Sequence, residues 1–192
     1  MLNIKFRKIQ RAYLRDLYFT ILTQSHKINI LKLRLFGFKA FIQLLLNNPE
    51  LIIVDEPTAG LDPAERHRFL NVLREIGTNH IVIFSTHIVD DVKELCTDMA
   101  IMNGGKILNH HTPGEIVADL QGKIWTKTID RDDLEQHEAM YNVISSNFNQ
   151  DNTLNIRVHS LEKPDESFEA KKPELEDVYF VTLREDSEVE VS

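Results

Sequence analysis

The stretch LIIVDEPTAGLDP, residues 51–63, decides the fold, because an unbroken apolar run passes directly into acidic and turn-forming residues. A second apolar run, IVIF, occupies residues 81–84 and is followed by Ser85, Thr86 and His87. Apolar runs without polar alternation are typical of strands that are buried on both faces of a parallel sheet. We therefore predict two parallel strands, at residues 51–54 and 81–84.

The residues between these two runs predict a helix. Asp62 suits the N-cap, Pro63 suits the first helical position, and Gly77 suits the C-terminal cap. The apolar stripe of this helix consists of Phe69, Val72, Leu73 and Ile76. Strand, helix and strand in this order form a βαβ unit, whose crossover we expect to be right-handed.

Side chains that can carry chemistry follow both predicted strands. Asp55 and Glu56 come directly after the first strand, and His87 follows the second. The carboxyl ends of parallel strands meet at one edge of a sheet, where open α/β sheets bind ligands. Taken singly, each residue has another reading: Asp55 and Glu56 form a solvated turn, Asp62 only caps a helix, and His87 is a surface histidine.

Downstream segments predict further helices and strands. We expect a helix at 88–95 and a helix that opens at 112–115. Between them, Asn103, Gly104 and Gly105 predict a tight hairpin turn that joins strands at 99–102 and 106–109.

A change of character after Gly122 predicts a separate C-terminal part. Residues 154–159 alternate between apolar and polar, as in a half-exposed strand. We expect a polar linker at 160–172, a helix that starts after Pro173, and a solvated, frayed acidic tail at 185–192. The expected organisation is a basic N-terminal segment with one helix (1–40), an α/β domain (41–122) and a small α+β appendage (123–192).

Composition is that of a globular protein, with 42% hydrophobic and 27% charged residues among 192. The single cysteine, Cys96, favours a reducing compartment, so we expect a cytoplasmic protein. The net charge of −8 is unevenly distributed, because residues 1–40 hold nine Lys and Arg but only one acid, Asp16. The basic head and the acidic body therefore have different tasks.

Together these segments resemble the ATP-binding subunits of ABC transporters. The resemblance covers roughly residues 41–120 and rests on several motifs in the family's order. Residues 51–58 resemble the Walker B segment, 59–63 the D-loop, 85–87 the switch histidine and 104–106 the hairpin that follows it. Leu175-Glu176-Asp177-Val178-Tyr179 is similar to a common ending of exporter-type subunits.

The resemblance implies a partial ABC-type P-loop fold with ATP and Mg²⁺ as cofactors. It assigns Asp55 to Mg²⁺ through water, Glu56 to the attacking water and His87 to the γ-phosphate. It also places three residues at the nucleotide and dimer interface: Thr58, Gly60 and Asp62.

Two motifs of the family have no counterpart in these 192 residues. No Gly-x-x-x-x-Gly-Lys-Ser/Thr pattern occurs, and LKLRL stands at residues 31–35, where the glycine-containing signature loop would fall. We therefore expect a truncated chain that does not hydrolyse ATP by itself. The missing P-loop strand would leave residues 81–84 as an exposed sheet edge, which we expect the N-terminal helix to cover.

The resemblance implies two partners, a transporter membrane subunit and a second ATP-binding subunit. We expect the chain at the inner face of the cell membrane and expect no nucleic-acid partner. The alternative is a non-enzymatic module that docks on a membrane subunit, an intact ATPase or a membrane surface. A fragment of a chromosome-maintenance ATPase is a third possibility, but it predicts coiled-coil heptads, which the sequence lacks.

Overall fold

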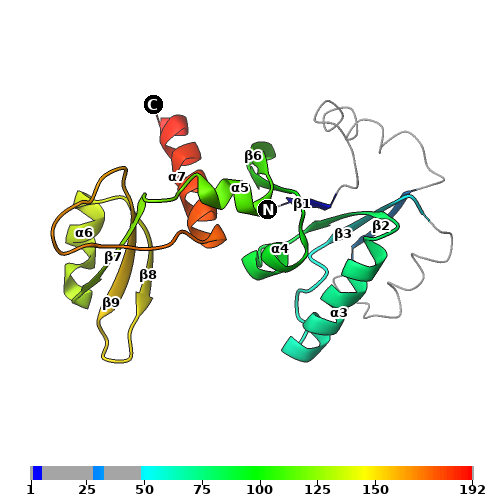
Figure 1. Ribbon diagram of the computed structural model, residues 1–192, viewed down its shortest axis with the longest axis horizontal. Coiled ribbons are helices and arrows are strands. Elements are labelled where there is room, and N and C mark those ends of the chain that lie inside the picture. The colour runs from blue at the N-terminus through cyan, green and yellow to red at the C-terminus, as the bar shows by residue number, and fades with distance from the viewer. Residues whose placement is uncertain (1, 6–27, 33–48, 192) are drawn as a thin grey trace. The chain divides into compact units, whose positions relative to one another are not determined.

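The computed structural model describes residues 2–5, 28–32 and 49–191 (Figure 1). The chain divides into two compact units, Met1–Pro113 and Gly114–Ser192, and each is described by itself. None of the helices in these described ranges is both long and apolar enough to cross a bilayer. The expected three-part division at residues 40 and 122 stays a prediction.

The first unit is built on a six-stranded sheet of order β2-β3-β4-β1-β5-β6. The strands are β1 (Leu2–Lys5), β2 (Ile28–Lys32), β3 (Leu51–Asp55), β4 (Ile81–Ser85), β5 (Met99–Asn103) and β6 (Lys106–His111). The pairs β2–β3 and β3–β4 are parallel, whereas β1 runs antiparallel to both β4 and β5. The two parallel strands predicted from the apolar runs are therefore confirmed.

The expectation that residues 81–84 form a sheet edge is wrong. Strand β1 pairs with β4 from Leu2↔Ser85 to Lys5↔Val82, so β4 is bonded on both sides. Strand β2 lies in a stretch of the sequence that shows no periodic pattern. The N-terminal helix expected to cover β4 falls on residues 6–27, which lie outside the described residues.

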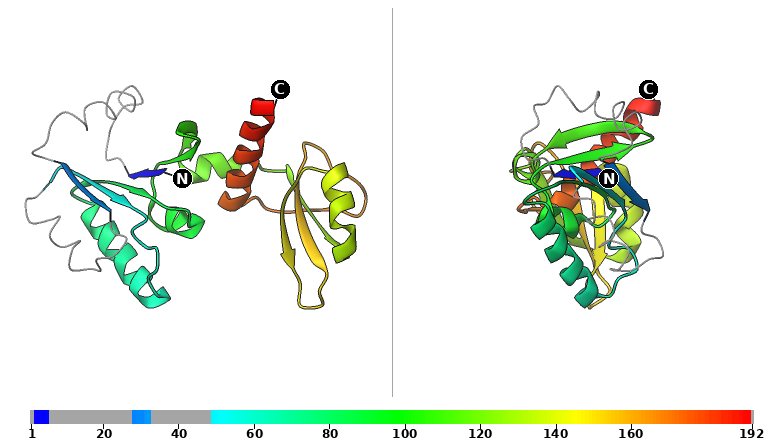
Figure 2. Two further views of the ribbon diagram at one scale, coloured as in Figure 1. Left: turned by 180° about the vertical axis from the view of Figure 1, so that it is seen from behind. Right: turned by 90° about the vertical axis from the view of Figure 1, so that its right-hand side faces the viewer.

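Helix α3 (Pro63–Ile76) packs against the sheet, and the two together form the hydrophobic core of the first unit (Figures 1 and 2). Its Phe69, Leu70 and Leu73 are buried with Ile52 of β3 and Phe84 of β4. The predicted caps are present. Asp62 accepts a hydrogen bond of 2.8 Å from the Glu65 amide, and the Gly77 amide donates to the Leu73 carbonyl at 2.9 Å. The Asp62 side chain satisfies a backbone amide that has no partner within the helix, and Gly77 closes the last turn of the helix.

The hairpin of the first unit has the predicted turn. Gly104 and Gly105, with φ of 54° and 79°, connect the paired residues Asn103 and Lys106. Two successive residues with positive φ make the type of turn that matches the twist of the flanking strands. Helix α4 (Val89–Leu95) precedes this hairpin, and α5 (Pro113–Ala118) follows it.

The second unit holds a four-stranded antiparallel sheet of order β10-β7-β9-β8. Its strands are β7 (Ile124–Ile129), β8 (Val143–Phe148), β9 (Leu154–His159) and β10 (Glu169–Ala170). Its helical elements are the 3₁₀ turn η2 (Arg131–Asp133), α6 (Leu134–Met140) and α7 (Leu175–Val191). Strand β9 alternates buried and half-buried residues, which confirms the predicted half-exposed strand. The α+β character expected of this part of the chain is therefore confirmed.

Two expectations about the second unit are wrong. The segment at 160–172 is more than a polar linker, because it forms β10 and buries Phe168, which is 1% exposed beside Ile156 and Val158. A lone phenylalanine among polar residues gives no periodic pattern, so the sequence did not reveal it. The acidic tail does not fray at residue 185, because α7 continues to Val191.

The motif at residues 175–179 has a structural role in this unit. Leu175 and Val178 are buried, and Asp177 forms a nearly buried ion pair with Arg157 of β9. The two contacts join Nε to Oδ1 at 2.6 Å and one terminal nitrogen to Oδ2 at 2.5 Å. Asp177 also accepts a bond from the Glu174 amide at the start of α7, so one carboxylate both caps this helix and ties it to the sheet.

The segment before β10 is held by Asp165. Its carboxylate accepts bonds from the Ser167 hydroxyl, the Ser167 amide at 2.7 Å and the Tyr141 hydroxyl at 2.9 Å. These bonds, those from Ser167 first, lower the pKa of Asp165 from 3.8 to about 2. The same contact raises the pKa of the Tyr141 phenol.

We predict that acid weakens the second unit through Asp165. A carboxyl whose pKa is lowered by folding stabilises the fold above its unfolded pKa and loses that contribution as pH falls through its folded pKa. Urea unfolding of the intact chain should therefore show a loss of stability between pH 4 and about 2 that is smaller in Asp165→Asn. The fluorescence of Trp125, the only tryptophan, reports on this unit. Identical pH profiles for the two chains would contradict the assignment.

Candidate functional site

The candidate site lies where β3 and β4 end side by side. Asp55 and Ser85 are the last residues of these parallel strands and are paired in register. The Ser85 hydroxyl donates a hydrogen bond to Asp55 Oδ1 and accepts one from the Glu56 amide at 3.0 Å. The strand register alone therefore brings the two polar strand ends together at one edge.

Glu56 and His87 meet directly beyond this edge. The distance between Glu56 Oε2 and His87 Nδ1 is 2.6 Å, and the two side chains are 39% and 69% exposed. The structure thus joins two residues 31 positions apart, as the parallel strands predicted. Because both side chains are well exposed, this contact contributes little to stability and leaves both groups accessible to a ligand.

The backbone of Glu56 has an unusual conformation. Its φ is 49°, in the left-handed region that residues other than glycine rarely occupy. Its amide is held by two acceptors of the neighbouring strand end, the Ser85 carbonyl at 3.1 Å and the Ser85 hydroxyl at 3.0 Å. Such a conformation costs about 1 kcal/mol, and it persists where the surroundings fix it. The turn that carries Glu56 is therefore determined by Ser85.

The three residues assigned to the nucleotide and dimer interface lie on the loop between β3 and α3. Gly60 has a φ of 79°, a conformation that suits glycine, and it is exposed. Asp62 is also exposed and caps α3. Thr58 is different, because it is only 2% exposed and its hydroxyl points into the protein. The interface role of all three stays a prediction.

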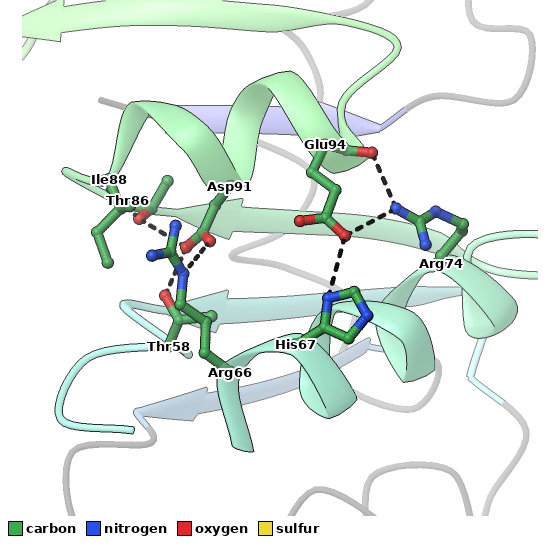
Figure 3. Close-up of polar contacts among 8 residues, drawn as sticks. All are labelled: Thr58, Arg66, His67, Arg74, Thr86, Ile88, Asp91 and Glu94. Atoms are coloured by element: carbon green, nitrogen blue, oxygen red, sulfur yellow. Dashed lines mark hydrogen bonds and ion pairs between the residues drawn. The ribbon is translucent and has the colours of Figure 1, made fainter. Parts of the chain in front are cut away.

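A buried carboxylate beneath this loop was missed by the sequence analysis. Asp91 of α4 is 0% exposed, and its Oδ2 accepts bonds from Thr58 at 2.6 Å and Thr86 at 3.4 Å (Figure 3). Its Oδ1 accepts a bond of 2.8 Å from Nε of Arg66 on α3. Asp90 and Asp91 look alike in the sequence, and only the rotation of α4 decides which of them is buried. Arg66 likewise looks like an ordinary residue on the polar side of a helix.

A second polar contact joins α3 and α4 nearer the surface. Glu94 accepts a bond of 3.1 Å from Arg74 and lies 3.9 Å from His67 (Figure 3). All three side chains are at least one-third exposed, so the net stabilisation is small. This exposed cluster provides a natural comparison for the buried one.

The donor set at the edge fits a magnesium ion that is held mostly by other ligands. Asp55 and Ser85 offer oxygen atoms, which Mg²⁺ prefers, and the ion usually takes only one or two protein carboxylates. Within the described residues, no three His, Cys, Asp or Glu side chains gather into a metal cage. The edge could therefore share an ion with phosphate oxygens and water.

His110 and His111 of β6 are half-buried. Nε2 of His110 lies 3.7 Å from Asp98. The two histidines are successive on a strand, where neighbouring side chains point to opposite faces, so they do not share a ligand.

We predict that Arg66→Met destabilises the first unit by about 3 kcal/mol, because it leaves a buried carboxylate without its cation. The matched control is Arg74→Met, which removes only exposed contacts, those with Glu94 and Asn71, and should cost less than about 1 kcal/mol. Urea unfolding followed by far-UV circular dichroism measures both values. Equal losses for the two variants would show that the Asp91 charge does not depend on Arg66.

Comparison with known proteins finds relatives of one kind. No protein-family model matches the chain. The chain is 42% identical over 72 residues to the energy-coupling factor transporter ATP-binding protein EcfA2 of Lactobacillus acidophilus. The aligned residues make up 37% of this chain and 25% of that protein. The chain is also 33% identical over 79 residues to the Nod factor export ATP-binding protein I of Neorhizobium galegae, which covers 41% and 23%.

Solved structures give matches of the same kind. An ATP-binding subunit of an ABC transporter matches at 31% identity over 38% of this chain and 31% of that one, with a TM-score of 0.35. The cbiO1 protein from Clostridium perfringens, part of the ABC transporter complex cbiONQ, matches at 31% identity over 42% and 33%, with a TM-score of 0.37. The chain spans about a quarter of the length of the curated relatives that it matches. By sequence identity, the matched part of this chain is homologous to the ATP-binding subunits of ABC transporters.

Proposed function

We propose that this chain acts as part of the ATP-binding subunit of an ABC transporter and supplies one side of its nucleotide site. The observation that supports this most is the contact between Glu56 and His87, beside Asp55 and at the ends of two parallel strands. Edges of this kind are where open α/β sheets bind ligands. The likeness to ATP-binding subunits supports a nucleotide as the ligand.

In this proposal the three side chains have separate tasks. Mg²⁺ would neutralise phosphate charge, and Asp55 would hold it through water with Ser85 as a neighbouring oxygen. Glu56 would hold and orient the attacking water, because a carboxylate accepts hydrogen bonds from it. His87 would donate a hydrogen bond to a phosphate oxygen. While Nδ1 of His87 contacts Glu56, the second ring nitrogen, Nε2, is the one that serves this purpose.

The chain by itself should bind nucleotide weakly and should not hydrolyse it. The 192 residues contain no Walker A pattern, whose backbone amides and lysine hold the phosphates in P-loop enzymes. The loss of a single preorganised donor costs about 2.7–4 kcal/mol of barrier, and here several are missing together. The partners that we propose are a second ATP-binding subunit and a transporter membrane subunit, at the inner face of the cell membrane.

The direction of transport that we propose is export. The support is the ending Leu175–Tyr179, which resembles exporter-type subunits and which the second unit uses to attach α7. The relatives named above include an energy-coupling factor subunit and a Nod factor export subunit, and only one of these names states export.

We predict Mg²⁺-dependent binding of a fluorescent ATP analogue that is weaker in Asp55→Asn, together with no ATP hydrolysis above background. Equilibrium titration and a phosphate-release assay measure the two properties. Hydrolysis that disappears in Glu56→Gln would contradict the expected inactivity. The absence of any binding to the folded chain would favour the alternative function as a docking module.

The basic N-terminal segment supports this alternative. Residues 1–40 carry nine Lys and Arg against one acid, which favours attraction to anionic lipid headgroups. We predict that the full chain co-sediments with vesicles that contain phosphatidylserine. Salt at 0.5 M shortens the Debye length to roughly a few ångströms, so it should release the bound chain. Equal binding to neutral vesicles would contradict an electrostatic attachment.

A further inference from the structure

The buried carboxylate of Asp91 joins three segments that are distant in the sequence. Thr58 belongs to the loop after β3, Thr86 to the segment after β4, and Arg66 to α3 (Figure 3). Asp91 itself lies on α4 and is completely buried. It is therefore a shared acceptor for the two chain segments that leave the sheet at the candidate site.

The segments held by Asp91 are the ones that carry the site. Thr58 follows Glu56 by two residues, and Thr86 directly precedes His87. Both hydroxyls donate to the same oxygen, Oδ2, so a movement of either segment would stretch or break one of these bonds. The Thr86 hydroxyl also accepts a bond of 3.0 Å from the Ile88 amide, which further fixes the turn around His87.

The chemistry of the cluster requires a carboxylate. Its two oxygens accept from two hydroxyls on one side and from a guanidinium on the other, and an asparagine amide would turn a donor toward one of these donors. An apolar residue would fill the space but would leave the hydroxyls of Thr58 and Thr86 without this acceptor. A fully satisfied buried polar cluster specifies one arrangement of its members, whereas apolar packing tolerates several.

We propose that Asp91 is a positioning residue, which holds Glu56 and His87 at contact distance by bonding Thr58 and Thr86 through one buried oxygen. It acts through these two threonines and does not touch the nucleotide. Its importance for transport rests on the proposed function, but its effect on the Glu56–His87 pair can be measured without any nucleotide.

The test uses nuclear magnetic resonance of the imidazole ring of His87 in the full chain. In the unmodified background, Glu56→Gln should shift the His87 ring signals, because the group 2.6 Å from Nδ1 loses its charge. In the Asp91→Asn and Thr58→Val backgrounds, the same substitution should produce little or no shift. Thr58→Ser keeps the hydroxyl and should restore the response, which a merely space-filling role of Thr58 would not predict.

A second readout is hydrogen exchange of the Glu56 and Ile88 amides, which are bonded to Ser85 and Thr86. We expect exchange at both amides to become about tenfold faster, or more, in Thr58→Val and Asp91→Asn. Glu94→Gln is the matched control, because it weakens the exposed contact between the same two helices and should leave both readouts unchanged.

The outcomes separate this inference from the proposed function. A full His87 response to Glu56→Gln in the folded Thr58→Val chain would overturn the positioning role. If Asp91→Asn does not fold, the pair Thr58→Val and Thr58→Ser decides the matter. The response of His87 can be lost in Thr58→Val while the unmodified chain binds no ATP analogue. That combination would support the positioning role and contradict the nucleotide site.

Discussion

The parallel register of β3 and β4 is the constraint on which the first unit depends. Pairing from Leu51↔Ile81 to Asp55↔Ser85 places two apolar runs side by side and ends both at the same edge. A shift of one residue would move Ser85 away from Asp55 and would remove the acceptors that hold the Glu56 amide. Burial of Ile52, Val54, Val82 and Phe84 under α3 makes such a shift costly, so the hydrophobic core sets the geometry of the polar edge.

Local patterns predicted the central βαβ unit because each of its signals lies within a few residues. Apolar runs mark the strands, Asp62 and Gly77 mark the ends of the helix, and two glycines mark the hairpin. The meeting of Glu56 and His87 followed from the strand order alone, although the two residues are 31 positions apart. The roles assigned to them come from the family resemblance and stay predictions.

The features that could not be predicted depend on contacts between distant segments. The four residues of β1 carry no sequence pattern that predicts their pairing with β4. The burial of Phe168 depends on a sheet formed by other strands. Asp91 is buried beside the loop after β3 because α4 turns that side inward, whereas Asp90 is exposed. In the second unit, Asp177 similarly meets Arg157 across 20 positions. Periodicity identifies apolar faces, but a buried ion pair has no periodic signature.

In the proposed function, the charges gathered at the edge explain why the site would depend on other groups. Asp55 and Glu56 are both carboxyls, and a triphosphate carries negative charge as well, so their direct approach is unfavourable. His87 contacts Glu56, and in the proposed site a cation would compensate the charge of Asp55. The arrangement therefore suits a bound Mg²⁺ together with phosphate-binding donors from outside the described residues. In the proposed nucleotide site, acceptors around one imidazole can orient a water molecule and an ion, and the donors that bind phosphate would come from a different surface.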